Sequence, residues 1–186
     1  MTREELEHII RASADITNQY EFVIIGSQPI LGAIPSPPAI FTMSAELDIY
    51  PLQAPELADE IDGAIGEGSP FHDMNGVYAQ GVGPETAILP RGWFDRVHRV
   101  QTEATGGRLG YCLDVPDLFM SKAAAGRPKD REFCMALISH AYVTVGQAIA
   151  LVPDMPISGE MQRRLRATIH RWAKALRDAG HPGADE

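Results

Sequence analysis

Apolar residues recur along this chain with two different periods, and each change of period marks an expected change of secondary structure. Residues 3–18 carry apolar side chains at helical spacing, behind a Thr2 and Glu5 pair typical of a capping box. A β-branched and aromatic run predicts a strand over 21–25, and period-two alternation predicts another over 43–50. An acidic amphipathic helix is expected over 54–66, because its apolar stripe ends at Gly66 and Gly68.

The rest of the chain divides into a strand-rich stretch and a helical one. Short strands are expected around 76–80, 86–89, 97–103 and 109–113, with Gly and Pro between them. Helical periodicity then predicts helices over 116–125, 130–140, 143–151 and 159–177. The pattern indicates the α/β or α+β class, with a mixed sheet and flanking helices in 1–113 and a helical C-terminal part in 114–186. We expect one domain, since 186 residues is an ordinary domain length.

Charge is divided unevenly along the chain. The formal net charge is 16 − 25 = −9, and 45% of the residues are hydrophobic, which excludes a disordered or low-complexity chain. Residues 12–90 contain eleven Asp and Glu and no Lys or Arg, a charge of −11. Residues 91–186 contain fourteen Lys and Arg against eleven Asp and Glu, a charge of +3. The first stretch should repel anions, and the second is able to hold them.

The sequence gives no sign of a membrane segment or an export signal. Its longest apolar runs fall far short of the roughly 20 residues needed to cross a bilayer. The first residues lead directly into a polar helix pattern, so we expect a cytoplasmic protein without membrane contact. Cys112 and Cys134 lack metal-ligand spacing and are interpreted as small buried hydrophobic residues.

The strongest chemical signal joins a Gly-Ser turn to a pair of carboxylates. Gly26 and Ser27 end the first expected strand and precede a potential helix start at Pro29. Glu46 and Asp48 lie two positions apart on the next strand, so both point to one face. Their mutual repulsion favours a divalent cation, and Mg²⁺ binds one or two carboxylates together with water and substrate phosphate. Small residues at such a turn let a phosphate approach backbone N–H groups.

A simpler interpretation of this signal stays open. Glu46 and Asp48 would then lie on the solvent face of an edge strand, and Gly26 and Ser27 would form only a turn.

A second group of polar residues lies in the helical part. Lys122 follows Leu118 and Phe119 at helical spacing, so it leaves its helix on the apolar face. It is either a lysine that snorkels past the edge of the core or a cation directed at a triphosphate. Arg127 and Lys129 follow on a loop and are candidates for further phosphate contacts.

Asp130 has two interpretations as well. Its position before an apolar helical stretch is typical of an N-cap residue. The alternative is that its carboxylate orients Lys122 or acts as a base.

The order of these motifs resembles a known family. The chain is similar to minimal nucleotidyltransferases related to AbiEii-type toxins, in the polymerase-β-like superfamily, over roughly residues 20–140. The resemblance rests on three ordered motifs, which are Ile25-Gly26-Ser27, Glu46-Leu47-Asp48, and the series Asp117, Leu118, Lys122, Arg127 and Asp130.

The resemblance implies a fold, a cofactor and a set of partners. It implies that the Gly-Ser turn and the two carboxylates hold Mg²⁺ and a nucleoside triphosphate. It also implies an RNA acceptor such as tRNA, or a protein acceptor, and an antitoxin partner if the chain is a toxin. Two departures stand out: Glu46 occupies the position where the family typically has Asp, and no third acidic residue is evident beyond the candidate Asp114.

Two functions follow as hypotheses. The first is a Mg²⁺-dependent nucleotidyltransferase in which Glu46 and Asp48 bind the metal and Gly26 and Ser27 bind the triphosphate. In that hypothesis Lys122 neutralises the transferred phosphoryl group, assisted by the residues that follow it, Arg127, Lys129 and Asp130. The second is a catalytically impaired binding or regulatory module of the same fold, for example one partner of a toxin–antitoxin pair.

Overall fold

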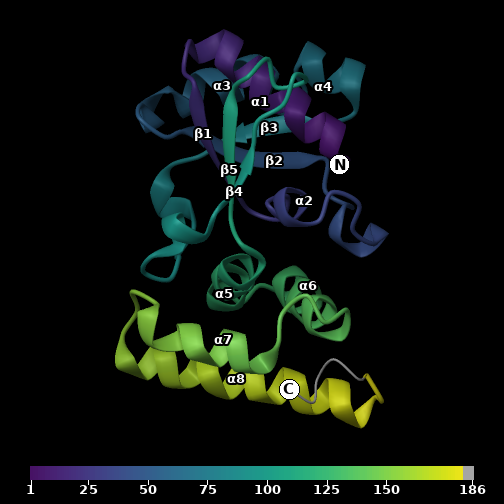
Figure 1. Ribbon diagram of the computed structural model, residues 1–186, viewed down its shortest axis with the longest axis vertical. Coiled ribbons are helices and arrows are strands. Elements are labelled where there is room, and N and C mark those ends of the chain that lie inside the picture. The colour runs from purple at the N-terminus through teal and green to yellow at the C-terminus, as the bar shows by residue number, and fades with distance from the viewer. Residues whose placement is uncertain (182–186) are drawn as a thin grey trace. The chain divides into compact units, whose positions relative to one another are not determined.

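The computed structural model describes residues 1–181 and forms two compact units. Unit 1 consists of residues 1–87 and 96–114, and unit 2 consists of residues 88–95 together with the chain from Val115 onward. Each unit has its own secondary structure (Figure 1). Within residues 1–181, no helix is both long and apolar enough to cross a membrane.

Unit 1 is built on a mixed five-stranded sheet with the strand order β3-β2-β1-β5-β4. β1 pairs antiparallel with β2 and parallel with β5, β2 pairs parallel with β3, and β4 pairs antiparallel with β5. The strands are β1 (Glu21–Ile25), β2 (Glu46–Pro51), β3 (Tyr78–Gly81), β4 (His98–Val100) and β5 (Leu109–Cys112). The helices of this unit are α1 (Arg3–Thr17), α2 (Ile30–Ala33), α3 (Ala58–Ile65) and α4 (Pro70–Asn75).

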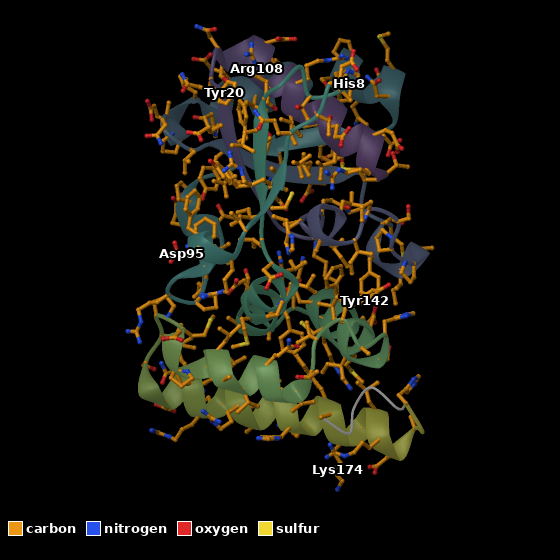
Figure 2. The ribbon with its side chains drawn as sticks, viewed as in Figure 1. His8, Tyr20, Asp95, Arg108, Tyr142 and Lys174 are labelled. Carbon is orange, nitrogen blue, oxygen red and sulfur yellow. The ribbon has the colours of Figure 1, made fainter. Side chains whose placement is uncertain are left out.

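Helices α1 and α3 pack against one face of the sheet. Gly110 of β5 leaves room for Ile10 of α1, whose side chain would lie 2.6 Å from a Cβ atom at that glycine. Gly81 of β3 similarly allows the close approach of the Ala58 carbonyl at the start of α3. The alternation of side chains along a strand places Glu46 and Asp48 on the opposite face. At the loop that precedes β5, Arg108 lies 6.0 Å from the ring centre of Tyr20, and both are labelled in Figure 2.

Unit 2 is helical and has a separate apolar core. Its helices are α5 (Val115–Ala125), α6 (Pro128–Ser139), α7 (Val145–Leu151) and α8 (Gly159–Asp178). Phe119 of α5 meets Trp172 of α8 edge to face, with the ring centres 6.3 Å apart. The segment 88–95 is held to this unit by Arg91, whose backbone N–H donates to the carbonyl of Asp154.

The predicted class, a mixed sheet with flanking helices and a helical C-terminal part, is confirmed. The capping box is also confirmed, because Thr2 and Glu5 exchange side-chain to backbone hydrogen bonds. The strand predicted over 86–89 is wrong: Pro84–Thr86 forms a 3-10 turn, and residues 87–89 are not in a strand. Proline favours the first turn of a helix and cannot donate to a strand ladder, and the predicted strand ended at another proline, Pro90.

Helix α4 lies where the hydrophobic pattern predicted no helix. Ser69 is its N-cap, and the Ser69 hydroxyl accepts a hydrogen bond from the His72 backbone N–H. Pro70 follows at the first helical position. This Ser-Pro pair was the available signal, because serine is a favoured N-cap and proline a favoured first helical residue.

Candidate functional site

The Gly-Ser turn, formed by Gly26 and Ser27, follows β1 directly and lies against Asp48. Gly26 has a φ of +78°, a left-handed conformation that side chains disfavour. A Cβ atom there would lie 1.8 Å from Oδ2 of Asp48 and 2.8 Å from its Cγ. Glycine is therefore required at position 26 for two reasons: the left-handed backbone conformation and the close approach of the Asp48 carboxylate. The helix that follows, α2, is only one turn long.

Glu46 and Asp48, called the carboxylate pair below, are half-buried on β2. In the sheet Asp48 is opposite Ile25 of β1 on one side and Gln80 of β3 on the other. Glu46 is opposite Tyr78, whose hydroxyl donates a 3.1 Å hydrogen bond to Oε2 of Glu46. Burial, together with the negative charge of Glu46, raises the pKa of Tyr78 to about 12. Tyr78 therefore remains a neutral hydrogen-bond donor to Glu46 near neutral pH.

Asp114, the candidate for a third carboxylate, has a histidine partner. It follows β5, and its Oδ1 lies 2.7 Å from Nε2 of His98 on β4. Neither strand paired with β2 places an acidic side chain opposite Asp48. Across residues 1–181, no group of three or more His, Cys, Asp and Glu side chains is arranged to hold a metal ion. A cation at this face would therefore have two protein carboxylates, which suits Mg²⁺ and its preference for water and phosphate in the remaining positions.

The candidate residues of unit 2 converge on one carboxylate, that of Asp130. Asp130 is only 1% exposed, and Nζ of Lys122 lies 3.4 Å from its Oδ1. Nε of Arg127 donates a 2.6 Å hydrogen bond to its Oδ2. The Lys122 ammonium also lies 5.2 Å from the ring centre of Phe133, a cation–π distance. Lys122 is thus buried between α5 and α6 with a carboxylate and an aromatic ring beside it.

The ionisation of Asp130 reflects two opposing influences. Burial by itself would raise the pKa of Asp130, but the Arg127 hydrogen bonds and the Lys122 charge outweigh it, so the pKa lies below its usual value. Asp130 is therefore ionised at neutral pH. It is the third residue of α6 instead of its N-cap, which is Arg127, and it accepts a hydrogen bond from the Arg127 backbone N–H. Lys129, in the first turn of the same helix, is exposed.

Tyr78 is a polar neighbour of the candidate site that the sequence pattern did not reveal. Strand β3 was expected, but its parallel register with β2 was not, and only the register pairs Tyr78 with Glu46. A single sequence carries no signal for that register, because β2 and β3 are separated by two helices, α3 and α4.

Comparison with known proteins identifies the family. Residues 4–147 match the family model described as "Nucleotidyltransferase of unknown function (DUF6036)". No curated protein and no solved structure matches the chain. The family match includes the Gly-Ser turn, the carboxylate pair and the residues around Asp130, and it covers more than half of the 186 residues. The chain therefore belongs to this DUF6036 family of nucleotidyltransferases.

Proposed function

We propose that this protein is a Mg²⁺-dependent nucleotidyltransferase that moves a nucleoside monophosphate from a nucleoside triphosphate to a hydroxyl group of RNA or protein. In this reaction the acceptor oxygen forms a bond to the α-phosphorus. The bond between that phosphorus and the bridging oxygen to the β-phosphate breaks, and pyrophosphate leaves with its electron pair. The acceptor proton passes to solvent or to a nearby base.

The contact between Gly26 and the Asp48 carboxylate is the observation that supports this proposal most. It brings a turn without side-chain bulk against a carboxylate that shares its face with Glu46. Asp48 and Glu46 would hold the metal, and backbone N–H groups at Gly26 and Ser27 would bind the triphosphate. When bound, Mg²⁺ would supply the positive charge that neutralises phosphate oxygens and aligns the reacting groups.

Three cations of unit 2 are proposed as phosphate-binding residues. The motif order assigns Lys122 to the transferred phosphoryl group and Arg127 and Lys129 to phosphate oxygens. Asp130 would orient Lys122 and Arg127, since its carboxylate accepts contacts from both. This assignment rests on the charge of these residues and on the motif order.

The test is a transfer assay with the four α-labelled nucleoside triphosphates, using total RNA and total protein as acceptors. We expect label in at least one acceptor when Mg²⁺ is present and none when EDTA replaces it, because the carboxylate pair by itself repels the triphosphate. Calorimetry should show a component of nucleotide binding that requires Mg²⁺ and that EDTA removes. Absence of both transfer and metal-dependent binding would refute the proposal. Growth arrest on expression that disappears in an Asp48→Asn strain would extend it to a toxin with an antitoxin partner.

Two observations favour a second candidate, a nucleotide-binding or regulatory module without transferase activity. The Tyr78 hydroxyl already occupies Oε2 of Glu46, and no third acidic residue joins the carboxylate pair within the described part of the chain. This candidate predicts nucleotide binding without label transfer. It also predicts that a Tyr78→Phe variant, which releases Glu46, increases metal-dependent binding without restoring transfer.

Replacement of Gly26 by alanine should displace the Asp48 carboxylate. Both Gly26→Ala and a matched Gly68→Ala variant put a side chain at a left-handed position, with φ values of +78° and +75°. Each should lower the free energy of unfolding by about 1–2 kcal/mol. A Cβ at Gly68 meets nothing within 4 Å, whereas one at Gly26 meets Asp48. Only Gly26→Ala should therefore lose transfer, measured with the labelled assay beside urea unfolding; equal transfer by the two variants would contradict this.

A further inference from the structure

A pocket of about 660 Å³ lies within unit 2, between the start of α6 and the middle of α8. Three arginines contribute to its wall: Arg127, the N-cap residue of α6, Arg131 of α6 and Arg171 of α8. We call this cavity the arginine pocket. Glu132 also lines it, so the formal charge of these four side chains is +2. This is a positive cavity in a chain whose net charge is −9.

The three guanidinium groups differ in how they are held. Arg127 is anchored by Asp130 through a 2.6 Å hydrogen bond, while its side chain remains 57% exposed. Arg171 donates a 2.8 Å hydrogen bond to the hydroxyl of Thr168, one turn earlier on α8. The Arg131 guanidinium is exposed and has no hydrogen bond or ion pair to any other residue of 1–181. Each arginine has five N–H donors, so Arg131 and Arg171 retain donors for a ligand.

The remaining wall of the pocket is partly apolar. Met135 of α6 and Trp172 of α8 contribute to it. Trp172 is only 8% exposed and is fixed by its edge-to-face contact with Phe119. An anion that fits such a pocket combines a strongly charged group with an uncharged body. Phosphate esters have this composition, and guanidinium groups bind phosphate through paired hydrogen bonds.

We propose that the arginine pocket binds a phosphate ester, carried by a free nucleotide or by the backbone of a nucleic-acid strand. Arg131 and Arg171 contact the phosphate from opposite helices, and Arg127 adds a third guanidinium held in place by Asp130. The basic side chains elsewhere on α8 are not part of the pocket; Lys174, for example, points away from the unit (Figure 2). This binding goes beyond the proposed transferase reaction and needs neither Mg²⁺ nor the carboxylate pair.

The experiment measures binding by the full chain without Mg²⁺, using fluorescence anisotropy for a labelled single-stranded RNA and calorimetry for ATP. A double Arg131→Ala, Arg171→Ala variant should weaken binding about tenfold or more, because each hydrogen bond from a charged donor contributes substantially to affinity. For RNA, the slope of log K against log salt should become less negative by about 1.4, roughly 0.7 for each phosphate that the variant no longer neutralises. An effect on ATP identifies a nucleotide as the source of the phosphate, and an effect on RNA alone identifies the strand.

The matched control is a double Arg163→Ala, Arg166→Ala variant, which removes the same charge from α8 outside the pocket. Equal weakening by both double variants would overturn the proposal, because binding would then follow total charge instead of the pocket. Unchanged binding in the pocket variant would overturn it as well. Displacement of the labelled RNA by a polyglutamate peptide of the same total charge would indicate a site for acidic peptides. That result would also contradict the proposal.

The outcome is separable from that of the proposed transferase function. An Asp48→Asn protein should bind RNA or ATP in the arginine pocket as the natural chain does. Pocket binding with neither transfer nor Mg²⁺-dependent nucleotide binding would support the arginine pocket and refute the transferase. Transfer by a protein whose RNA and ATP binding is unchanged in the Arg131→Ala, Arg171→Ala variant would support the transferase and refute the arginine pocket.

Discussion

Asp48→Asn should reduce label transfer by at least roughly 100-fold, the largest effect on activity that we expect from a single conservative change. Asparagine preserves the size of the side chain and one oxygen, but it removes the negative charge that would attract Mg²⁺. The carboxylate pair would be reduced to Glu46, which is already hydrogen-bonded to Tyr78. Metal-dependent nucleotide binding, measured by calorimetry, should disappear in parallel.

The stability of the Asp48→Asn protein distinguishes a functional role from a structural one. Two carboxylates on one strand face repel each other, so removal of one charge should leave the free energy of unfolding unchanged or raise it. An Asp59→Asn variant is the control, because Asp59 is an exposed acidic residue on α3 of the same unit. Full transfer by Asp48→Asn, or an equal loss in Asp59→Asn, would show that the carboxylate pair is not the metal site.

Asp130→Ala should have the largest effect on stability, about 3–5 kcal/mol at neutral pH. The variant leaves the Lys122 ammonium buried without the carboxylate 3.4 Å away. It also removes the acceptor for the Arg127 backbone N–H at the start of α6. Urea unfolding followed by circular dichroism measures the effect. Asp154→Ala is the control, since it breaks an exposed ion pair with Arg91 and should cost at most about 1 kcal/mol.

The contribution of Asp130 should depend on pH in a defined direction. Its pKa in the folded protein lies below 3.8, the ordinary value for an aspartate and the one expected in the unfolded chain. The stabilisation is therefore complete above about pH 4 and is lost as the pH falls through the folded-state pKa. The difference in unfolding free energy between the natural chain and Asp130→Ala should shrink in that acidic range.

A double substitution tests whether the stability lost in Asp130→Ala comes from an unpaired buried charge or from lost side-chain packing. A Lys122→Met, Asp130→Leu variant removes both buried charges, and Arg127 can turn its exposed guanidinium to solvent. Replacement of a buried ion pair by apolar residues is often neutral, so this variant should recover most of the stability that Asp130→Ala removes. If Asp130→Ala proves no more destabilising than Asp154→Ala, the buried ion pair does not stabilise the packing of α5 against α6.

Much of the fold could be predicted from local signals. The helix over 3–17 followed from apolar periodicity and the capping box, and the strand over 21–25 from its run of β-branched and aromatic residues. These signals act over a few residues, so a single sequence contains them. The strand predicted over 86–89 failed because hydrophobic content there was not supported by partner strands, while Pro84 favoured a 3-10 turn.

The candidate site was predictable only in its parts. Gly26 and the carboxylate pair were recognisable from spacing, because the strand period places Glu46 and Asp48 on one face. The contact between Gly26 and Asp48 depends on the antiparallel register of β1 and β2, which brings Ile25 opposite Asp48. The alternatives for Lys122 likewise could not be separated from spacing, which gives the face of a helix but not the partner.

The sequence by itself determined the fold class, the residue types available for metal and phosphate binding, and the unequal distribution of charge. The tertiary structure decided which of those residues meet: Gly26 with Asp48, Glu46 with Tyr78, and Lys122 and Arg127 with Asp130. It also decided that Arg131 and Arg171, forty residues apart in sequence, line one pocket. The physical reason is that secondary structure depends on nearby residues, whereas strand register and helix packing depend on how distant apolar surfaces fit together.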